Sequence, residues 1–486
     1  MGQRVALGTL AGVVGFLAFV EFTSGVLQGY YTPMLTDIAR ALGIHDADVN
    51  WLEGTQLMLS ALVVPVMAKL GDMVGHKRML LVSTAVTAAA SLALPFTDSF
   101  AVFLIAWALQ GFYVVWLPLE IALIWSRSRR APGRAALTAK AAGLLVAALE
   151  AGAITGALVG GALVDVLPLT IVLLVPALLV VLCFVVIAFG VKESPDPTGG
   201  RVDTVGLILI SLALLAFTGG LSLLRLSGPG DLVAWAVVVV GLALVVPFVL
   251  WELRHPDPLV DVRMFRSPAL GPVFLTAGLF GVSVLGAQAP LSTFARTDPE
   301  VYGYGLGTSG FATSLIIGVY LIAMIVGALL FPVVSRRLTP RYALLGAALL
   351  VGIGFLMFLP LHDAYGQVIG NMVVVGLGSG ALVAALPAAA ASAAPATQTG
   401  VATGLTNSVK TVGGAIASCV FGIALFSGTV TATTGVEETA GSFSGYLTVW
   451  LVCGATAIVA AVLLLFVPKG SFTDRSLTVE PVATMR

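Results

Sequence analysis

Three acidic side chains lie inside long apolar stretches of the sequence. Glu21 lies in GFLAFVEFTSGVLQGYY (residues 15–31), Glu120 in the fourth apolar stretch and Glu150 in the fifth. A charged group at the centre of a membrane-spanning helix costs roughly 2.5 to 3.5 kcal/mol on insertion scales, so such residues usually face a cavity or a partner. The chemistry open to these acids is to carry a proton, to bind a cationic ligand, or to pair with a buried base.

Lys410 is the only base that the sequence places deep in an apolar stretch. It either neutralises one of the acids or contacts an anionic substrate. Burial favours the neutral form of a carboxyl group, and we therefore predict that Glu21, Glu150 and Glu120 take up and release protons. No histidine is placed to relay these protons, because all four fall in loops or near the ends of apolar stretches: His45, His76, His255 and His362.

Polar and aromatic side chains near these charges are candidates for a substrate cavity. Offsets of four and seven residues return to one helical face within about 40°, which predicts a shared face for Glu120, Trp116 and Tyr113. An aromatic stripe that faces the core would explain the rings but not the carboxylate. The residues predicted to line the cavity are Thr23, Gln28, Gln110, Tyr113, Trp116 and Lys410.

The elements that position these residues are membrane-spanning helices. The chain has 486 residues, of which 58% are hydrophobic and 10% charged, against roughly 25% charged in a soluble domain. About 20 apolar residues are needed for each crossing, which predicts an all-α polytopic membrane protein with fourteen spans. The predicted spans are 5–31, 49–68, 79–97, 101–125, 137–164, 168–191, 203–225, 231–252, 269–295, 309–334, 342–361, 364–392, 400–427 and 443–467.

The distribution of basic residues predicts the orientation. Of the 24 Lys and Arg residues, only Arg40, Arg225 and Arg296 fall on the side away from Met1, and Lys410 lies within a span. The positive-inside rule therefore predicts that both termini are cytoplasmic, in a multi-pass protein of the cell membrane.

Two polar linkers divide the spans into groups of six, two and six. KESPDPTGGRVD (192–203) follows the sixth span, and ELRHPDPLVDVRMFRSP (252–268) follows the eighth. We predict an N-terminal six-helix bundle over 1–191, two additional spans within 192–268, a C-terminal six-helix bundle over 269–467 and a cytoplasmic tail over 468–486. Two similar halves with a site between them are typical of a rocking transporter.

Two groups of residues outside the acids have spacing that suggests a role. The loop after the second span is predicted to be a charge latch, in which an acid at a helix end pairs with bases that begin the next helix and biases two conformations; a plain basic anchor is the alternative. Glycines in the fifth span recur every four residues and predict close helix packing, which generic GxxxG contact also explains. The latch residues are Gly71, Asp72, Gly75, Lys77 and Arg78, and the packing residues are Gly152, Gly156, Gly160 and Gly161.

Several other chemistries have no motif in this sequence. It contains no GxxxxGK[ST] phosphate loop, no HExxH and no GxSxG elbow. Its three cysteines are not spaced as metal ligands, and its basic residues are not interleaved with aromatics as in nucleic-acid binders. We therefore expect a protein that is not an enzyme, needs no cofactor beyond a proton gradient and binds no nucleic acid.

Four stretches together resemble the major facilitator superfamily, and fourteen spans resemble its drug:proton antiporter family. The stretches are GDMVGHKR (71–78), GAITGALVGG (152–161), GYGLGTSGF (303–311) and GVATGLTNSVKTVGGAIAS (400–418). Glu21 and Thr23 match the family's acid-x-Thr spacing in the first span. The sequence departs from the family at Ala157 and Trp107, where a proline and an arginine are usual, and at Pro33, where the proline comes late.

The resemblance implies the major facilitator fold and an alternating-access antiporter. We predict a proton-coupled exporter of hydrophobic, often cationic drugs or related small molecules that functions as a monomer among membrane lipids. A narrow-range transporter of one metabolite or antibiotic, and a lipid translocase, are alternatives within the same fold. A non-transporting membrane receptor or scaffold is the alternative from another class.

Overall fold

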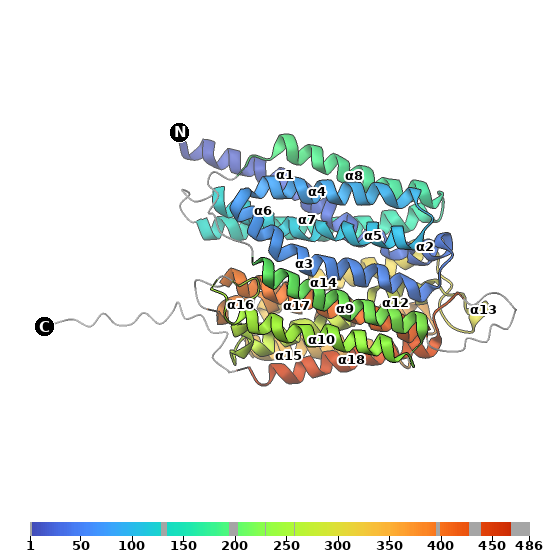
Figure 1. The fold of residues 1–486 in the computed structure, drawn as a ribbon. Helices are drawn as coiled ribbons and strands as arrows, with labels where there is room; N and C mark the ends of the chain where they lie inside the picture. Colours follow the sequence, from blue (N-terminus) through green and yellow to red (C-terminus); the bar gives the residue numbers. More distant parts are fainter. Residues whose placement is uncertain are drawn as a thin grey trace.

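The computed structural model describes residues 2–127, 134–193, 203–228, 230–256, 258–394, 399–426 and 439–467, with side chains from residue 14 onward. The predicted tail, 468–486, lies outside the described residues. Those that are described form helices and connecting turns, with no strand (Figure 1). The helices are α1 (Gly2–Tyr30), α2 (Leu35–Leu42), α3 (Val49–Val74), α4 (His76–Ala93), α5 (Phe100–Gln110), α6 (Trp116–Arg127), α7 (Arg134–Val164), α8 (Leu169–Gly190), α9 (Thr204–Ser227), α10 (Leu232–Glu252), α11 (Gly271–Val284), α12 (Gln288–Arg296), α13 (Pro299–Tyr302), α14 (Gly310–Leu338), α15 (Pro340–Met357), α16 (Tyr365–Ala393), α17 (Thr399–Phe426) and α18 (Phe443–Leu464).

The long helices fall where the apolar stretches predicted spans. Within the described part of the chain, 13 helical segments are long and apolar enough to cross a membrane, from Asp46–Val74 to Phe443–Leu464. The remaining predicted span, 5–31, coincides with α1. The prediction of an all-α polytopic membrane protein is therefore confirmed, with a count of spans close to the fourteen expected.

Two predicted spans are interrupted, and a proline explains each interruption. Span four bends through a 3₁₀ segment, Gly111–Val115, between α5 and α6. Pro118 lies four residues beyond Val114 and cannot donate to its carbonyl group. Span nine breaks between α11 and α12, and Pro290 stands in the same relation to Gly286 within that break. Helical phase calculated through either point from the sequence is therefore shifted.

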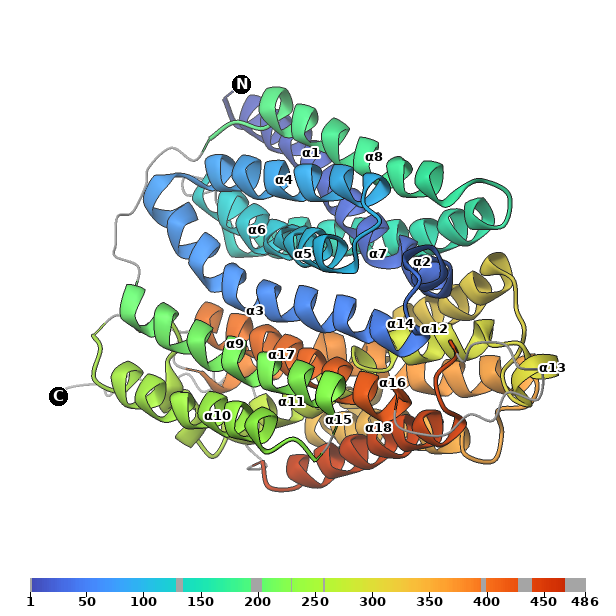
Figure 2. The same ribbon diagram turned by 45° about the vertical axis from the view of Figure 1, so that its right-hand side comes forward.

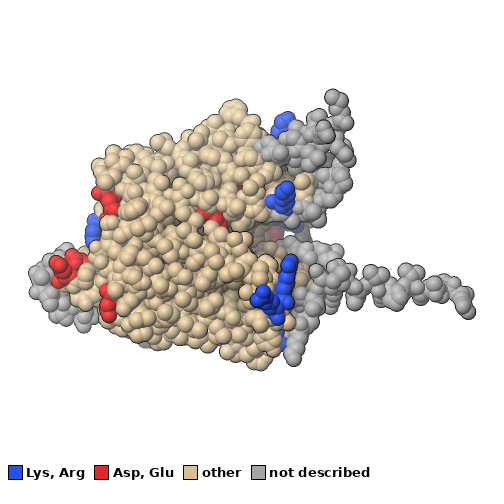
Figure 3. Space-filling model, turned by 180° about the vertical axis from the view of Figure 1, so that it is seen from behind, with Lys and Arg blue, Asp and Glu red and all other residues tan. Residues whose placement is uncertain are grey.

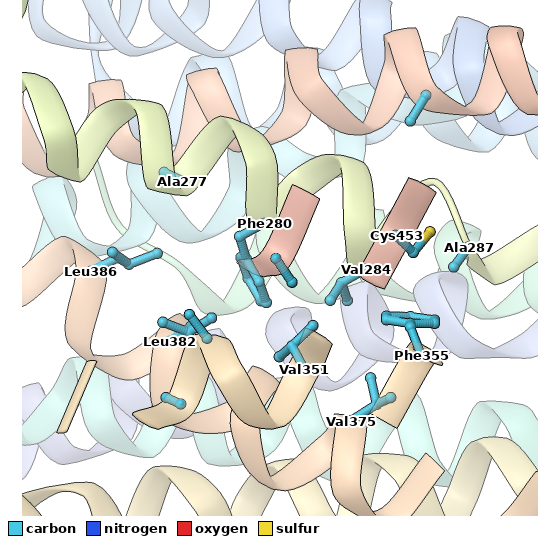
Figure 4. Packing of buried hydrophobic residues seen from close by; sticks show 14 of the residues in the cluster. Ala277, Phe280, Val284, Ala287, Val351, Phe355, Val375, Leu382, Leu386 and Cys453 are labelled. Carbon is cyan, nitrogen blue, oxygen red and sulfur yellow. The ribbon is translucent and has the colours of Figure 1, made fainter. Parts of the chain in front are cut away.

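The helices form two hydrophobic cores. One is built from α1 to α8 and contains Leu17, Trp107 and Trp116. The other is built from α11, α12 and α14 to α18, where Phe280 of α11 lies near Leu382 of α16 and Phe355 of α15 lies near Val375 of α16 (Figure 4). We call these groups of helices the N-terminal and C-terminal halves. The residue limits predicted for the bundles stay a prediction.

The extra pair, α9 and α10, lies against the seam between the halves (Figure 2). Its two helices pack on each other tightly enough that a Cβ added at Gly241 would lie 2.4 Å from the nitrogen of Phe217. Leu214 of α9 packs with Met58 of α3 and Ala415 of α17 in one apolar cluster. Since α3 and α17 belong to different halves, α9 covers the line along which those halves meet.

The closest helix contact of the N-terminal half joins α1 to α7. A Cβ added at Gly152 would lie 2.1 Å from the carbonyl oxygen of Phe22, and one added at Gly25 would lie 1.9 Å from that of Leu149. No side chain fits such a gap, because backbone and backbone are already in contact. The glycines that α1 and α7 place in this contact are Gly25, Gly29, Gly152, Gly156 and Gly160.

Replacement of Gly152 by valine should separate these two helices. Overpacking of a tight core costs about 1–3 kcal/mol, and here the new methyl groups would meet backbone that cannot rotate away. We expect Gly152→Val to lower the midpoint of thermal unfolding in detergent, measured by size-exclusion fluorescence. Gly143→Val on the same helix is the matched control, because a Cβ at Gly143 meets nothing within 4 Å. An equal loss in both variants would contradict the contact.

Candidate functional site

Charge divides the molecule into two ends. Lysines and arginines gather at one end, which we call the basic end, and acidic side chains are prominent at the other, which carries α2, α12 and α13 and which we call the opposite end (Figure 3). The described basic-end residues include Lys69, Lys77, Arg78, Lys192, Arg336, Arg337 and Arg341. This division follows the predicted sorting of charge along the sequence.

At the opposite end, one arginine ties the two halves together. Arg296 ends α12 and donates to both carboxylate oxygens of Asp37 in α2, at 2.6 and 2.7 Å. It also lies 3.9 Å from Asp165, just after α7, and donates to the carbonyl oxygen of Thr308. The side chain is 11% exposed, so water screens these charges weakly. In the sequence, Arg296 stood out only as one of three basic residues predicted on the side away from Met1.

Asp165 makes a second link between the halves at this end. Its carboxylate accepts the backbone N–H groups of Gly310 at 2.8 Å and Phe311 at 2.9 Å, which are the first residues of α14. An anion at a helix N-terminus satisfies free N–H groups and meets the positive end of the helix dipole. The preceding loop needs glycine to reach this position, since Gly305 has φ +100°.

The helices themselves also touch along two seams toward the opposite end. A Cβ added at Gly161 of α7 would lie 2.5 Å from the carbonyl oxygen of Gly310 in α14. In the other seam, one added at Gly54 of α3 would lie 2.8 Å from the sulfur of Cys419 in α17. Gly161 therefore acts apart from Gly152, Gly156 and Gly160, because it faces the other half of the protein.

The basic end is different, because Figure 3 shows a recess there between the halves. The described links between halves named above all lie away from this end. The structure is therefore closed at the opposite end and recessed at the basic end. Such an arrangement gives access to the space between the halves from one side.

The start of α4 is held by an acid outside the predicted latch, and the latch itself stays a prediction. We expected Asp72 to pair with Lys77 and Arg78. Instead, Glu193, just beyond α8, contacts the start of α4. Its two carboxylate oxygens accept hydrogen bonds from the backbone N–H groups of Lys77 at 2.9 Å and Arg78 at 3.0 Å. The ammonium of Lys77 donates to the carbonyl oxygen of Ala188 at 2.8 Å, while Asp72 contacts His76 at 3.2 Å.

Glycine is required in this loop, and the reason lies in the same contact. Gly75 has φ +123°, and a Cβ there would lie 2.6 Å from the carboxyl carbon of Glu193. Gly75 and Glu193 both belong to the N-terminal half. The loop therefore fastens α4 to α8, and residue spacing within the loop gave no sign of an acid that lies more than 100 residues away.

Glu21 and Glu120 meet in the interior of the N-terminal half. Both are 0% exposed and lie on α1 and α6, which pack against each other, and each carboxyl group acts on the other. None of the four oxygens receives a hydrogen bond from a described donor. Cys183 of α8 and Thr23 of α1 complete the surroundings, and the Thr23 hydroxyl is committed to the carbonyl oxygen of Phe19 at 2.9 Å. The sequence identified both acids but not that they form a pair.

The predicted cavity residues are not brought together in one place. Gln110 donates to the hydroxyl groups of Tyr31 at 2.9 Å and Ser91 at 2.8 Å, so it faces into the N-terminal half. Trp116 is fully buried in the core of that half, in edge contact with Tyr113, and Gln28 is exposed on α1. The prediction treated span four as one regular helix, and the 3₁₀ segment before Pro118 breaks that regularity.

Glu150 and Lys410 lie on helices of different halves. Glu150 lies on α7, which packs against α1 and α14, and Lys410 lies on α17, which packs against α3 and α11. Both are half-buried, and each feels the charge of the other, but no ion-pair contact joins them. Tyr320 of α14 lies within range of Glu150, beside Ser379 of α16. The hydroxyl groups of Tyr320 and Ser379 are both buried without a hydrogen bond of ordinary geometry, and the sequence gave no signal for either.

Two helical halves, closed at one end, recessed at the other and carrying charged groups between them, are typical of a membrane transporter. The comparison with protein families agrees. Residues 17–418 match the family model described as Major Facilitator Superfamily, and the chain belongs to that superfamily.

Several relatives are antibiotic exporters. The chain is 26% identical over 384 residues to the tetracenomycin C resistance and export protein of Streptomyces glaucescens, covering 78% of this chain and 69% of that protein. It is 28% identical over 438 residues to the cephamycin export protein CmcT of Amycolatopsis lactamdurans, covering 88% and 87%. Over 439 residues it is 24% identical to the multidrug resistance protein Stp of Mycobacterium tuberculosis, covering 87% and 76%.

Solved structures share the fold at low sequence identity. The crystal structure of the nucleoside transporter NupG aligns with a TM-score of 0.60 and 13% identity, covering 96% of this chain and 98% of that one. An auto-inhibited peptide transporter of the POT family aligns with a TM-score of 0.66 and 16% identity, covering 94% and 96%. These likenesses establish the fold and leave the substrate open.

Loss of the Arg296 links should open the opposite end. We expect Arg296→Ala to lengthen the distance between spin labels placed at Arg40 of α2 and Glu300 of α13, both exposed positions at that end. Buried pairs that lose one partner leave an uncompensated charge and are destabilised by about 3–5 kcal/mol, so the shift in population should be large. Arg336→Ala at the basic end is the control. Unchanged distances in Arg296→Ala would mean that helix packing alone holds this end closed.

Proposed function

We propose that the protein is a proton-coupled exporter that exchanges protons for hydrophobic, often cationic small molecules by alternating access. The observation that carries the proposal is the Glu21 and Glu120 pair, buried without a donor in the half that must move. Support for export as the direction comes from the names of the Streptomyces and Amycolatopsis relatives.

The carboxyl pair is suited to hold a proton because of its surroundings. Two carboxylates that share one buried site repel each other and have lost their hydration, and both effects are relieved when one of them is protonated. The proton can then form a hydrogen bond from one carboxyl group to the other. Loss of that proton would leave two charges between α1 and α6, and thus favour a conformation in which these helices separate or admit water.

Exchange follows if proton binding and substrate binding favour different conformations. The links of Arg296 and Asp165 hold the opposite end closed while the basic end is recessed. For the protein to open at the opposite end, these links must break and the two halves must approach each other at the basic end. A ligand can shift the equilibrium between two conformations only by the difference in its affinity for them. In this proposal the proton is one such ligand, because Glu21 and Glu120 bind it more tightly in one conformation than in the other.

The basic end is the cytoplasmic end in this proposal. Cytoplasmic loops carry an excess of Lys and Arg, so the recess faces the cytoplasm of a cell-membrane protein with both termini on that side. A proton gradient is the energy source, no cofactor takes part, and one chain surrounded by lipid is the functional unit. Glu150 and Lys410 lie on helices of different halves, and we assign Glu150 to substrate binding rather than to proton binding.

A narrower substrate range is a second candidate. Two of the relatives are each named for a single antibiotic, tetracenomycin C and cephamycin, whereas the Mycobacterium relative is named for multidrug resistance. A panel of compounds separates the two candidates, because a narrow-range exporter moves one chemical class and leaves the rest of the panel untouched.

Replacement of either paired acid should uncouple substrate movement from protons. Proteoliposomes with an imposed pH gradient and an enclosed pH dye are given a panel of cationic and zwitterionic dyes and drugs. We expect substrate-dependent proton flux in the native protein and a decrease of about tenfold in Glu21→Gln and in Glu120→Gln, within the usual range of coupling between sites. Substrate binding in detergent should persist in both variants, because neither acid lies between the halves.

Glu300→Gln is the matched control, since Glu300 is an exposed acid on α13. Native proton dependence in both Glu21→Gln and Glu120→Gln would contradict the assignment of the proton to this pair. Absence of substrate-dependent proton movement in the native protein, across the whole panel, would favour the receptor or scaffold alternative. Flux that only lipid stimulates would favour the lipid translocase.

A further inference from the structure

We propose that Glu150 and Lys410 are the two poles of a substrate site that selects amphoteric compounds, which carry an acidic and a basic group on one apolar frame. The basic group of the substrate would bind at Glu150 and its acidic group at Lys410. This inference rests on the proposed function, and narrows the substrate from hydrophobic cations in general to molecules with both charges.

The two poles belong to different halves and stand on opposite sides of the space between them. On one side α7 packs on α14, and on the other α17 packs on α3. Glu150 shares a helical face with Gly161, which lies eleven residues, close to three full turns, further along α7. Gly161 meets Gly310 of α14 at the seam, so this face of α7 is turned toward the C-terminal half.

The two groups act on each other electrostatically and are not joined as a salt bridge. A direct bond would satisfy both groups and would need no ligand. Here each group is half-buried and has lost part of its hydration, which favours a bound group of opposite charge. A purely cationic substrate at Glu150 would be repelled by Lys410, and a purely anionic one at Lys410 by Glu150. A zwitterion meets attraction at both poles.

Two neighbouring hydroxyl groups, those of Tyr320 and Ser379, lie near the same site. Tyr320 is 7% exposed and Ser379 is 0% exposed, and the hydroxyl oxygen of each is buried without a hydrogen bond of ordinary geometry. Buried polar groups are normally satisfied, and leaving one unsatisfied costs about 1–3 kcal/mol. Tyr320 lies near Glu150, so a substrate that reaches this pole also finds hydroxyl groups with which to hydrogen-bond.

The poles are also distinct from the proton site. Glu21 and Glu120 are fully buried within one half, and in the described part of the chain no lysine or arginine is among the groups that act on them. Glu150 and Lys410 come from two halves and approach or separate as those halves move. A substrate that bridges the two poles therefore draws the halves together, which is the motion that closes the recess at the basic end.

Three xanthene dyes on one frame test the charge preference. Rhodamine 110 is a zwitterion, rhodamine 123 is its methyl ester and carries only the positive charge, and fluorescein carries only negative charge. Fluorescence polarisation with the purified full-length protein in detergent measures their affinities without transport. We expect rhodamine 110 to bind at least about fivefold more tightly than either of the others, an amount typical of one charge-assisted contact.

Single substitutions should remove the preference one pole at a time. Lys410→Gln should bring rhodamine 110 to the affinity of rhodamine 123, and Lys410→Arg should retain the difference. Glu150→Gln should abolish the advantage of rhodamine 110 over fluorescein. Glu300→Gln on α13 should bind as the native protein does, and elution as a single monodisperse peak confirms that each variant is folded.

The result separates this inference from the proposed function. Equal affinity of the native protein for the three dyes, or a preference that Lys410→Gln leaves intact, would overturn the two-pole site while dye-driven proton flux in proteoliposomes still supported export. Absence of binding by all three dyes would overturn it as well. Charge-selective binding in detergent without any substrate-dependent proton flux would instead sustain the site and refute the proton-coupled exporter.

Discussion

The direct backbone contact between α1 and α7 is the constraint on which the positions of the charged groups depend. Glycine on both helices allows each to press on carbonyl groups of the other, which fixes the rotation of both about their axes. With one face of α1 committed to α7, Glu21 is turned toward α6 and meets Glu120. With one face of α7 committed to α1, Glu150 is turned toward α14. Small residues in one stripe thus determine where two acids on other faces point.

The two halves are held together by polar links and by packing that are unevenly distributed. Arg296 and Asp165 join the halves through charge and helix-end N–H groups, and such contacts break and form again without remodelling a core. The hydrophobic cores lie mostly within each half, so they would persist in the proposed rocking of the halves. α9 touches both halves along one seam and is tied to the start of α3 by the Arg225 and Asp48 ion pair, which makes the extra pair a cover for that seam.

Composition and hydrophobic length predicted the helices well, because the energetics of crossing a membrane depends on runs of about 20 apolar residues. They also located Glu21, Glu120, Glu150 and Lys410, since charge within such runs is conspicuous. Which acid meets which group depends on helix rotation and on contacts between residues far apart in sequence. That is why Glu193 replaces Asp72 as the partner of α4.

Local irregularity accounts for the other differences. The 3₁₀ segment before Pro118 changed the phase on which the aromatic wall of span four was based, and Pro290 split span nine into α11 and α12. Neutral hydroxyl groups such as those of Tyr320 and Ser379 carry no signal in composition, because serine and tyrosine are ordinary within long helices. Their place beside Glu150 follows only from the way α14 and α16 pack.

Because the halves are held together near one end only, a tilt of one half displaces the two ends of its helices by different amounts. A helix rises 1.5 Å per residue, so α7, with 31 residues, is a rod about 45 Å long that is held against the other half near one end. From Gly161 back to the start of α7 is about 40 Å, so a tilt of about 10° around the contact of Gly161 with Gly310 moves that far end by roughly 7 Å. The same tilt moves atoms beside the contact by less than the width of a water molecule. In the proposed motion, a small displacement at the opposite end would thus produce a large displacement of the helix ends at the basic end.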